Sequence, residues 1–333
     1  MKYRTSYRLF LILFLAGLFF HLDPSLHAEE LPCLKEIHIA SPLDGNSQPV
    51  RIWVPEQAKS QPTPLFIFLH SWSGNYTQNN SKWQREAVKR GWIFLHPNFR
   101  GPNKSPKACG SKFARQDILD SLDHVLKKYN VDRSRIYLAG SSGGGHMAML
   151  MAGHYPEKFS AVSAWVGISD LAAWYRFHTK NGEPQHYAKM ILASLEGAPG
   201  TSKEIDLAYK DRSPIFYLHK IGQLPIDLNA GVNDGHSGSV PIYHTIKAYN
   251  VIAAANHGKS ISKNEMDQLW EKQKLSSPIA CDIAGDKTYS RKIHLRRNTG
   301  PARITIFEGG HESLPEAACE WLSKQRRATV QSP

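Results

Sequence analysis

The sequence predicts an α/β fold with a mostly parallel central sheet and helices on both of its faces. Continuous apolar runs of strand length occur at 64–70, 92–97 and 135–140, as expected for strands that are buried on both sides. Segments with helical spacing lie between these runs, at 81–91 and 114–130. Such alternation of buried strand and amphipathic helix is typical of a parallel sheet.

The first 28 residues are expected to form a secretory signal peptide. Lys2, Arg4 and Arg8 precede the apolar run LFLILFLAGLFF, and a polar stretch then ends at Ala28. The apolar run is too short to cross a bilayer comfortably, which disfavours a permanent anchor. We therefore expect a secreted or periplasmic protein with no stable membrane anchor after cleavage.

The chain is basic, with 41 Lys and Arg against 29 Asp and Glu and a formal net charge of +12. Removing residues 1–28 takes away three basic residues and one acidic residue, which leaves 38 against 28 and a net charge of +10. The basic residues are scattered, so we interpret them as a solvated surface and expect no nucleic-acid partner. Such a surface would suit an anionic extracellular polymer without establishing one.

The remaining elements follow from local patterns. Two short strands are expected between Glu36 and Val54, and a helix is expected to run from the end of the 135–140 strand to about Pro156. Further strands are predicted at 159–167 and 226–234, and residues 292–310 read as a hairpin whose second arm is a candidate last strand of the sheet.

The predicted catalytic domain covers 29–325 and has two interruptions. Residues at about 168–213 are expected to form a small helical cover over one end of the sheet, and a second insertion lies at about 254–290. In the second insertion, Ser262 and Glu265 have the spacing of a helix-capping box. Residues 326–333 are expected to form a disordered tail.

The stretch Gly140-Ser141-Ser142-Gly143-Gly144 fits the pattern Gly-x-Ser-x-Gly. It lies between a buried strand and a helix, where the α/β-hydrolase fold carries its nucleophile elbow. Side chains at 140 and 144 would block so sharp a turn, and the turn would place Ser142 beside N–H groups that stabilise a developing negative charge. A phosphate-binding turn is disfavoured, because neither G-x-G-x-x-G nor a P-loop Gly-Lys-Ser is present.

A serine nucleophile needs a base, and the base needs a carboxylate that orients it. In α/β-hydrolases the acid and then the histidine follow the serine, in loops after later strands. Asp234 and His311 directly follow predicted strands in this order. We expect Ser142, Asp234 and His311 to form a catalytic triad, with Asp227 and His236 as the main competitors.

The loop FLHSWSGNY after the 64–70 strand is the expected second half of an oxyanion hole. The backbone N–H of Trp72, or that of Ser71, would join the N–H of Gly143 there, whereas His70 is expected to be structural. The Trp72 ring is a candidate wall of the acyl pocket. Ser71, Trp174 and Tyr175 are the candidate substrate-binding residues, although aromatic side chains in a cover are also typical of a packed core.

Four cysteines follow the predicted signal peptide: Cys33, Cys109, Cys281 and Cys319. In an oxidising compartment they would allow two disulfides, with three possible pairings. The chain has no Cys-x-x-Cys motif, and GGHE at 309–312 lacks the second histidine of a zinc-protease helix. We therefore expect neither a metal nor a cofactor.

These motifs together resemble the catalytic domain of the prolyl oligopeptidase family, within the α/β-hydrolases. The resemblance extends from about Pro64 to Leu322 and rests on FLHSWSG, RGWIFLHPNFRG, VDRSRIYLAGSSGGG, YKDRSPIFYLHKI, NAGVNDGHSGSVP and FEGGHES. It implies the same nucleophile, acid and base. The chain departs from the family pattern in two ways. Val240-Pro241 follows the acid after a longer interval than is usual in the family, and only a short segment precedes the hydrolase core where the family's peptidases carry a β-propeller.

We therefore predict a secreted serine hydrolase that works through an acyl-enzyme intermediate. We favour a carboxylesterase that acts on acyl esters of extracellular glycans or on small esters. The alternative is a serine peptidase that cleaves short peptides, as the closest motifs imply. A binding protein with a relic triad is disfavoured, because all three catalytic residue types are present. The oligomeric state is left open.

Overall fold

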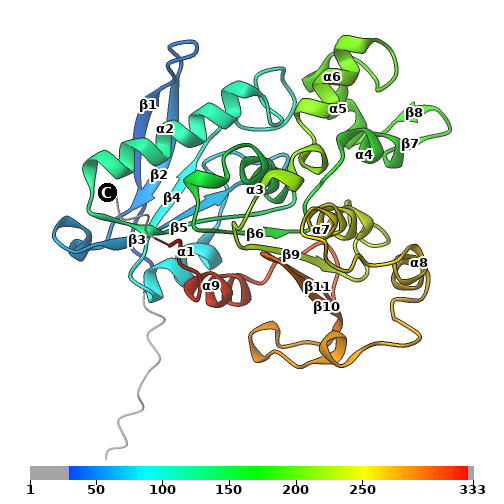
Figure 1. Ribbon diagram of the computed structural model, residues 1–333. Coiled ribbons are helices and arrows are strands. Elements are labelled where there is room, and N and C mark those ends of the chain that lie inside the picture. Colours follow the sequence, from blue (N-terminus) through cyan, green and yellow to red (C-terminus); the bar gives the residue numbers. More distant parts are fainter. Residues whose placement is uncertain (1–29, 329–333) are drawn as a thin grey trace, which may run out of the picture. The chain divides into compact units, whose positions relative to one another are not determined.

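The computed structural model describes residues 30–328, and within them a nine-stranded sheet runs through the centre of the molecule (Figure 1). The predicted signal peptide lies outside the described residues. The order in the sheet is β1-β2-β4-β3-β5-β6-β9-β11-β10. Its strands are β1 (Lys35–Ala40), β2 (Ser47–Trp53), β3 (Thr63–Leu69), β4 (Ile93–Pro97), β5 (Val131–Ser141), β6 (Ala161–Trp165), β9 (Ile226–Gly231), β10 (Ile293–Thr299) and β11 (Ala302–Phe307).

The centre of the sheet is parallel and its edges are antiparallel. Strands β4, β3, β5, β6, β9 and β11 pair in parallel, whereas β1 and β2 at one edge and β10 at the other run against their neighbours. Every residue of β3 and β4 is buried, as their continuous apolar runs predicted. The predicted α/β fold is confirmed, including the hairpin whose second arm, β11, joins the sheet beside β9.

Helices cover both faces of this sheet. Figure 1 shows α1 and α9 on one face and α2, α3 and α7 on the other. Their bounds are α1 (Ser81–Lys89), α2 (Lys112–Lys128), α3 (Gly143–His154), α7 (Tyr243–Ala255) and α9 (Pro315–Ser323). The short 3-10 turns of the same layers are η1 (Glu56–Lys59), η2 (Pro156–Lys158), η3 (Pro214–Phe216) and η4 (Leu218–Lys220).

The segment 168–213, called the cover below, contains three helices and a small hairpin. They are α4 (Leu171–Phe177), β7 (Thr179–Lys180), β8 (Glu183–Pro184), α5 (His186–Leu195) and α6 (Lys203–Asp211). The cover has its own buried apolar cluster, which includes Leu171, Trp174 and Ile191 from its helices. Trp72 and Val240 from outside the cover belong to the same cluster. With Cys109, which belongs to this cluster as well, three loops of the main domain are anchored in the cover by apolar burial.

The second insertion packs beside the β10 edge of the sheet. It contains α8 (Lys263–Lys272), η5 (Ala280–Ile283) and η6 (Lys287–Tyr289). The predicted capping box is present, since the Ser262 hydroxyl accepts from the Glu265 backbone and the Glu265 carboxylate accepts from the Ser262 backbone. Arg297 on β10 and Asp282 on η5 form a buried ion pair that ties the insertion to the sheet.

The expectation of two disulfides is not met, because all four cysteines are free thiols. Cys109 is buried in the cluster of the cover and Cys319 in the main core. Cys33 and Cys281 are exposed, but the first precedes β1 and the second lies on η5 beside β10, at opposite edges of the sheet. Neither arrangement brings two sulfur atoms to bonding distance.

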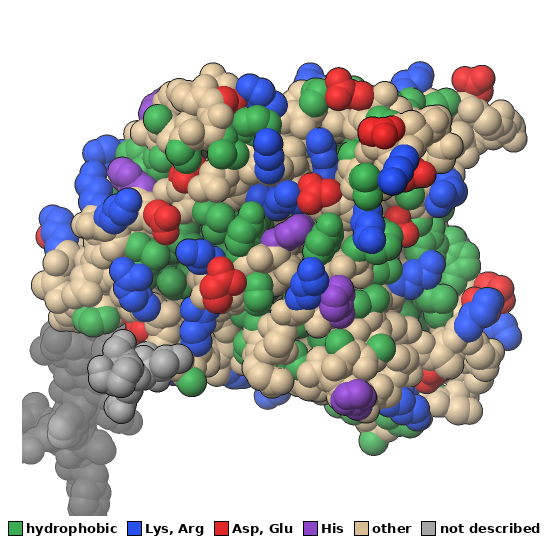
Figure 2. Space-filling model, turned by 45° about the horizontal axis from the view of Figure 1, so that its top comes forward, with side chains coloured by type: hydrophobic (Ala, Val, Ile, Leu, Met, Phe, Trp, Pro, Cys, Tyr) green, Lys and Arg blue, Asp and Glu red, His purple; other side chains and the backbone are tan. Residues whose placement is uncertain are grey.

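Charged side chains of both signs share the face of the molecule that Figure 2 draws. On the face drawn in Figure 2, Lys and Arg side chains are interspersed with Asp, Glu and apolar ones. Among residues 30–328, every helix is too short or too polar to span a membrane.

Candidate active site

The stretch Gly140–Gly144 forms a sharp turn between β5 and α3. Ser142 has φ 59° and ψ −117°, a conformation that costs a non-glycine residue about 1–3 kcal/mol. The turn is held by two backbone hydrogen bonds, from the Ser142 N–H to the carbonyl of Trp165 (2.9 Å) and from the His146 N–H to the carbonyl of Ser142 (2.9 Å). A strained serine, fixed on both sides, thus stands at the carboxyl edge of the sheet.

The glycines around Ser142 are required by close backbone packing. A Cβ atom on Gly140 would lie 2.2 Å from the carbonyl oxygen of Gly144, and one on Gly144 would lie 2.2 Å from the carbonyl oxygen of Leu69. Since these contacts are with backbone atoms, a side chain could be accommodated only if β3 or α3 moved. The structure thus agrees with the expectation from the sequence that positions 140 and 144 have no room for a side chain.

The structure brings Ser142, Asp234 and His311 together. The His311 Nε2 atom lies 2.9 Å from Ser142 Oγ, and His311 Nδ1 lies 3.0 and 2.9 Å from the two carboxylate oxygens of Asp234. Asp234 is fully buried and also accepts the N–H of Val240 at 3.1 Å. A carboxylate can only accept, so it holds the imidazole proton on Nδ1 and leaves the Nε2 lone pair facing the serine hydroxyl.

Strand register explains why residues so distant in sequence meet. Gly231 at the end of β9 pairs with Phe307 at the end of β11, and Ser141 at the end of β5 pairs with Trp165 on β6. Asp234 and His311 follow β9 and β11 within a few residues. All three side chains therefore emerge at the same edge of the sheet.

The two competing residues have other partners. The His236 ring stacks on Trp270 with centroids 3.8 Å apart, and its Nε2 donates to the carbonyl oxygen of Trp270. Asp227 is buried on β9 and forms an ion pair with Arg303 at 2.7 Å. Both residues thus have structural surroundings away from Ser142.

Gly143 and Trp72 bring two main-chain N–H groups side by side at the nucleophile. A Cβ atom on Gly143 would lie 2.4 Å from both the N and the Cα atom of Trp72. Gly143 is the first residue of α3, so its N–H has no acceptor within the helix. The other option, Ser71, is wrong as an oxyanion donor, because its N–H already donates to Gln78 Oε1 at 3.0 Å.

His70 is structural, as expected. Its ring is fully buried, stacks on Phe99, and lies within hydrogen-bond distance of the carbonyl oxygens of Ser71 (2.9 Å) and Asn98 (2.6 Å). Burial lowers the pKa of His70 to about 4, so the ring is neutral near pH 7. It fixes the loop that carries Trp72.

The aromatic residues of the cover require a correction. Trp174 has no exposed surface, and its indole N–H donates to the carbonyl of Ser239 at 2.7 Å, so it supports the site instead of touching a substrate. Its ring meets the edge of the Trp72 ring, which is buried too. Tyr175 is half-buried and faces Tyr209 within the cover, and its proposed role in binding stays a prediction.

Sequence reasoning missed Ser239. Its hydroxyl oxygen lies 3.3 Å from His311 Nε2, the nitrogen that also faces Ser142. The one sequence signal was the late arrival of Val240-Pro241, since the longer loop after Asp234 is what carries Ser239 back to the imidazole.

A polar cavity of about 370 Å³ adjoins the site. Its lining includes chain neighbours of three site residues, since Ser71 precedes Trp72, Ser141 precedes Ser142, and Ser313 follows His311 by two residues. Most of the lining residues carry a side-chain hydroxyl or amide group: Ser71, Gln78, Asn79, Asn80, Ser81, Ser141 and Ser313. The others are Phe68, Lys82, Trp83 and Pro315. Such a lining suits a ligand with many hydroxyl groups.

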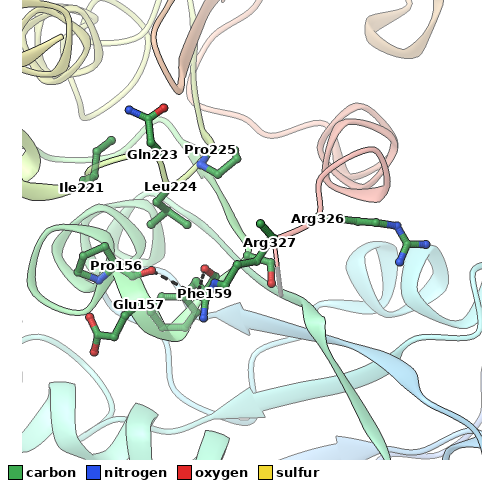
Figure 3. A pocket seen from close by; sticks show the side chains of 11 residues that line it. Pro156, Glu157, Phe159, Ile221, Gln223, Leu224, Pro225, Arg326 and Arg327 are labelled. Atoms are coloured by element: carbon green, nitrogen blue, oxygen red, sulfur yellow. Dashed lines mark hydrogen bonds between the residues drawn. The ribbon is translucent and has the colours of Figure 1, made fainter. Parts of the chain in front are cut away.

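A second cavity, of about 360 Å³, lies at the other end of the sheet (Figure 3). Its lining includes Ser160 and Pro225, which directly precede β6 and β9 and so mark the amino ends of parallel strands. The guanidinium of Arg327 donates there to the carbonyls of Pro156 and Phe159. This cavity is remote from Ser142. In the part of the chain that the structure describes, no cluster of three or more His, Cys, Asp or Glu could hold a metal ion.

Comparison with known proteins places this architecture among esterases and peptidases. The BD-FAE family model matches residues 50–245. Feruloyl esterase B of Neurospora crassa is 29% identical over 126 residues, which is 35% of this chain and 43% of that protein. Acetylxylan esterase A of Emericella nidulans is 22% identical over 187 residues, 50% of this chain and 61% of that protein. The chain thus spans less than two thirds of the length of these relatives.

Among solved structures, an acylaminoacyl peptidase of Pyrococcus horikoshii has a TM-score of 0.62 at 15% identity, covering 92% of this chain and 44% of that one. This likeness extends over nearly the whole described chain and concerns the fold. The resemblance to prolyl oligopeptidase-type α/β-hydrolases, inferred from sequence motifs, is confirmed.

Proposed function

The chain belongs to the BD-FAE family, and from that premise we propose that it is a serine hydrolase whose nucleophile, base and orienting acid are Ser142, His311 and Asp234. The observation that carries the proposal is the distance of 2.9 Å between Ser142 Oγ and His311 Nε2, on an imidazole whose other nitrogen is bound to a buried carboxylate. A hydroxyl that faces a basic nitrogen beside free main-chain N–H groups is the arrangement that acyl transfer requires.

In the acylation half, Ser142 Oγ attacks the acyl carbon of the substrate and passes its proton to His311 Nε2. Asp234 stabilises the imidazolium that forms and keeps its own charge. The carbonyl oxygen becomes an oxyanion and accepts from the N–H groups of Gly143 and Trp72. When the intermediate collapses, the bond to the leaving group breaks and the Nε2 proton moves to the departing oxygen.

In the deacylation half, water attacks the acyl carbon bound to Ser142, and His311 Nε2 takes the water proton. The bond between Ser142 Oγ and the acyl carbon then breaks, the proton returns from Nε2 to Oγ, and the carboxylic acid leaves. The enzyme is restored without a cofactor.

We further propose that the substrate is an acyl ester of a polyhydroxylated alcohol, such as an extracellular glycan. The polar cavity beside the site supports this choice, because its hydroxyl and amide groups match the hydroxyls of a sugar. The names of the two related esterases, which act on feruloyl and acetylxylan esters, agree with it. Export through the predicted signal peptide would bring the enzyme to such polymers.

The test compares the purified protein with Ser142→Ala and with the control Ser237→Ala, which removes a hydroxyl from the loop near the site. Substrates are p-nitrophenyl acetate, methyl ferulate, acetylated xylan and proline-containing peptide anilides. We expect ester hydrolysis that falls by about 10⁴ or more in Ser142→Ala and is kept in the control. Unchanged ester hydrolysis in Ser142→Ala would refute the triad, and anilide cleavage at comparable efficiency would make the enzyme a serine peptidase.

The glycan part is tested separately by Ser313→Ala, which removes a hydroxyl from the cavity. We expect KM for acetylated xylan to rise while the kinetics with p-nitrophenyl acetate, which lacks a sugar, stay the same. If Ser313→Ala had the same kinetics as the original protein with both substrates, the glycan proposal would be contradicted and the triad would be unaffected.

A further inference from the structure

Ser239 presents a second hydroxyl to the imidazole of His311. Its Oγ lies 3.3 Å from Nε2, while Ser142 Oγ lies 2.9 Å from the same nitrogen. Nε2 of a neutral imidazole offers one lone pair, and the shorter contact assigns it to Ser142. The hydroxyl of Ser239 therefore stands beside the base without being its direct proton donor.

The backbone around Ser239 is fixed on two sides. Its carbonyl accepts two hydrogen bonds from the cover side, from Trp174 Nε1 at 2.7 Å and from His178 Nε2 at 2.8 Å. The next N–H, that of Val240, donates to the Asp234 carboxylate at 3.1 Å. All three bonds involve backbone atoms and none involves the serine side chain. Removing the Ser239 hydroxyl would therefore leave the bonds that hold this part of the loop in place.

From this geometry we propose that Ser239 is a positioning residue for the water that hydrolyses the acyl-enzyme. Two polar atoms 3.3 Å apart can share one water at an ordinary hydrogen-bond length of about 2.8 Å from each. Water has two O–H groups, of which one points to His311 Nε2 and the other to Ser239 Oγ. The proposal rests on the proposed function, since it requires an acyl group on Ser142.

The chemical step keeps its balance without a proton on Ser239. The water oxygen bonds to the acyl carbon, and its first proton moves to Nε2. Ser239 Oγ accepts the second O–H throughout and exchanges nothing. The orientation of the water lone pair towards the acyl carbon is what Ser239 adds, since a water held by one bond to Nε2 can rotate about it.

This arrangement distinguishes water from an alcohol. Methanol has a single O–H, which it must give to Nε2, so it has no hydrogen left for Ser239 Oγ. The hydroxyl of Ser239 therefore favours hydrolysis of the acyl-enzyme over transfer of the acyl group to an alcohol.

The experiment uses Ser239→Ala, with Ser239→Thr as the variant that keeps a hydroxyl and Ser237→Ala as the matched control. Ser237 is on the same loop, and its hydroxyl bonds only the carbonyl of Asn233. The release of p-nitrophenol is followed before and during steady state, and the ratio of methyl ester to free acid is measured in dilute methanol.

For Ser239→Ala we expect the acylation burst to keep its rate, while hydrolysis of the acyl-enzyme slows about tenfold, as for one lost hydrogen bond. The ratio of methyl ester to acid should rise several-fold, and Ser239→Thr should restore most of the original ratio. Ser237→Ala should match the original protein in both readouts.

The proposal is overturned if the ratio stays constant in Ser239→Ala, whatever happens to the total rate, since a merely structural change would slow both acceptors alike. The proposal would also be overturned if the burst rate and kcat of Ser239→Ala fell together, because acylation would then be affected as well. If the original protein forms no acyl-enzyme on Ser142, it is the proposed function that fails, because Ser239 then has no acyl-enzyme to act on.

Discussion

Gly143→Ala tests the oxyanion hole through a clash that the structure defines. The added Cβ would lie 2.4 Å from the N and Cα atoms of Trp72, whereas ordinary van der Waals contact begins at 3.4 Å. The two backbones must therefore separate by about 1 Å. Trp72 cannot turn aside freely, because its ring is buried against Trp174 and its carbonyl accepts the N–H of Asn103 at 2.9 Å.

A shift of that size takes one N–H out of reach of the oxyanion, since donors work at about 2.7–3.1 Å from it, and losing one costs about 10²–10³ in kcat. The new methyl group also improves helix propensity at the start of α3 by up to about 1 kcal/mol, which offsets part of the strain. We therefore expect a large fall in kcat for p-nitrophenyl acetate together with a lower melting temperature, because the helix-propensity gain offsets only part of the strain.

The matched control is Gly285→Ala, because a Cβ atom at Gly285 would meet nothing within 4 Å. That variant should keep the kcat of the original protein. If folded Gly143→Ala also kept kcat within a few-fold, the N–H groups of Gly143 and Trp72 would not bind the oxyanion and the placement of the hole would be wrong.

Asp234→Asn should lower kcat by about 10⁴, because an amide in the buried site can donate to Nδ1 and so favours the wrong tautomer of the imidazole; full activity would remove Asp234 from the triad. Trp174→Phe replaces the indole with a smaller aromatic ring and removes the donor to the Ser239 carbonyl, so kcat should fall about tenfold with KM unchanged, whereas a rise in KM alone would restore a role in substrate binding. A thiol reagent should modify only Cys33 and Cys281 in the folded protein, since the other two thiols are buried, and dithiothreitol should leave the melting temperature unchanged; a shift would reveal a disulfide. Burial lowers the pKa of four fully buried histidines from 6.5, so the unfolded chain binds more protons and the free energy of unfolding falls as the pH drops from about 6.5 towards 4, by up to about 3 kcal/mol per histidine. These histidines, with their pKa values, are His70 (about 4), His96 (about 4), His146 (about 4) and His244 (about 3). The urea midpoint of unfolding should decrease as the pH is lowered from about 6.5 towards 4, and a constant midpoint would contradict the burial argument.

The parts of the fold that sequence could predict are those coded by local patterns. The apolar runs of β3 and β4 and the segment 136–140 of β5 are buried, so their length and composition identify them. The sequence also predicts strands β9 and β11, and because parallel strands end at one edge of a sheet, the residues that follow β5, β9 and β11 are expected to lie close together. This is why Asp234 and His311 could be placed beside Ser142 before any contact was known.

The features that sequence could not predict depend on single contacts between distant residues. The sequence leaves Ser71 as an alternative to Trp72, and what decides between them is a side-chain contact, because Gln78, seven residues later, accepts the N–H of Ser71. Trp174 has the composition of a sugar-stacking residue, yet its exposure is decided by how α4 lies on Trp72. The sequence is the same whether two cysteines are free or bridged, and only the positions of their sulfur atoms in the fold decide between the two.

The longer loop after Asp234 is best understood as the link between the cover and the triad. Val240 is buried in the cluster of the cover, and its N–H donates to Asp234. Trp72, whose N–H faces Gly143, is buried in that same cluster. The groups proposed to orient the base and to bind the oxyanion thus share one apolar core with α4. A cover that swung open as a rigid lid would pull both away from Ser142, so the catalytic arrangement requires the cover to stay in place during turnover.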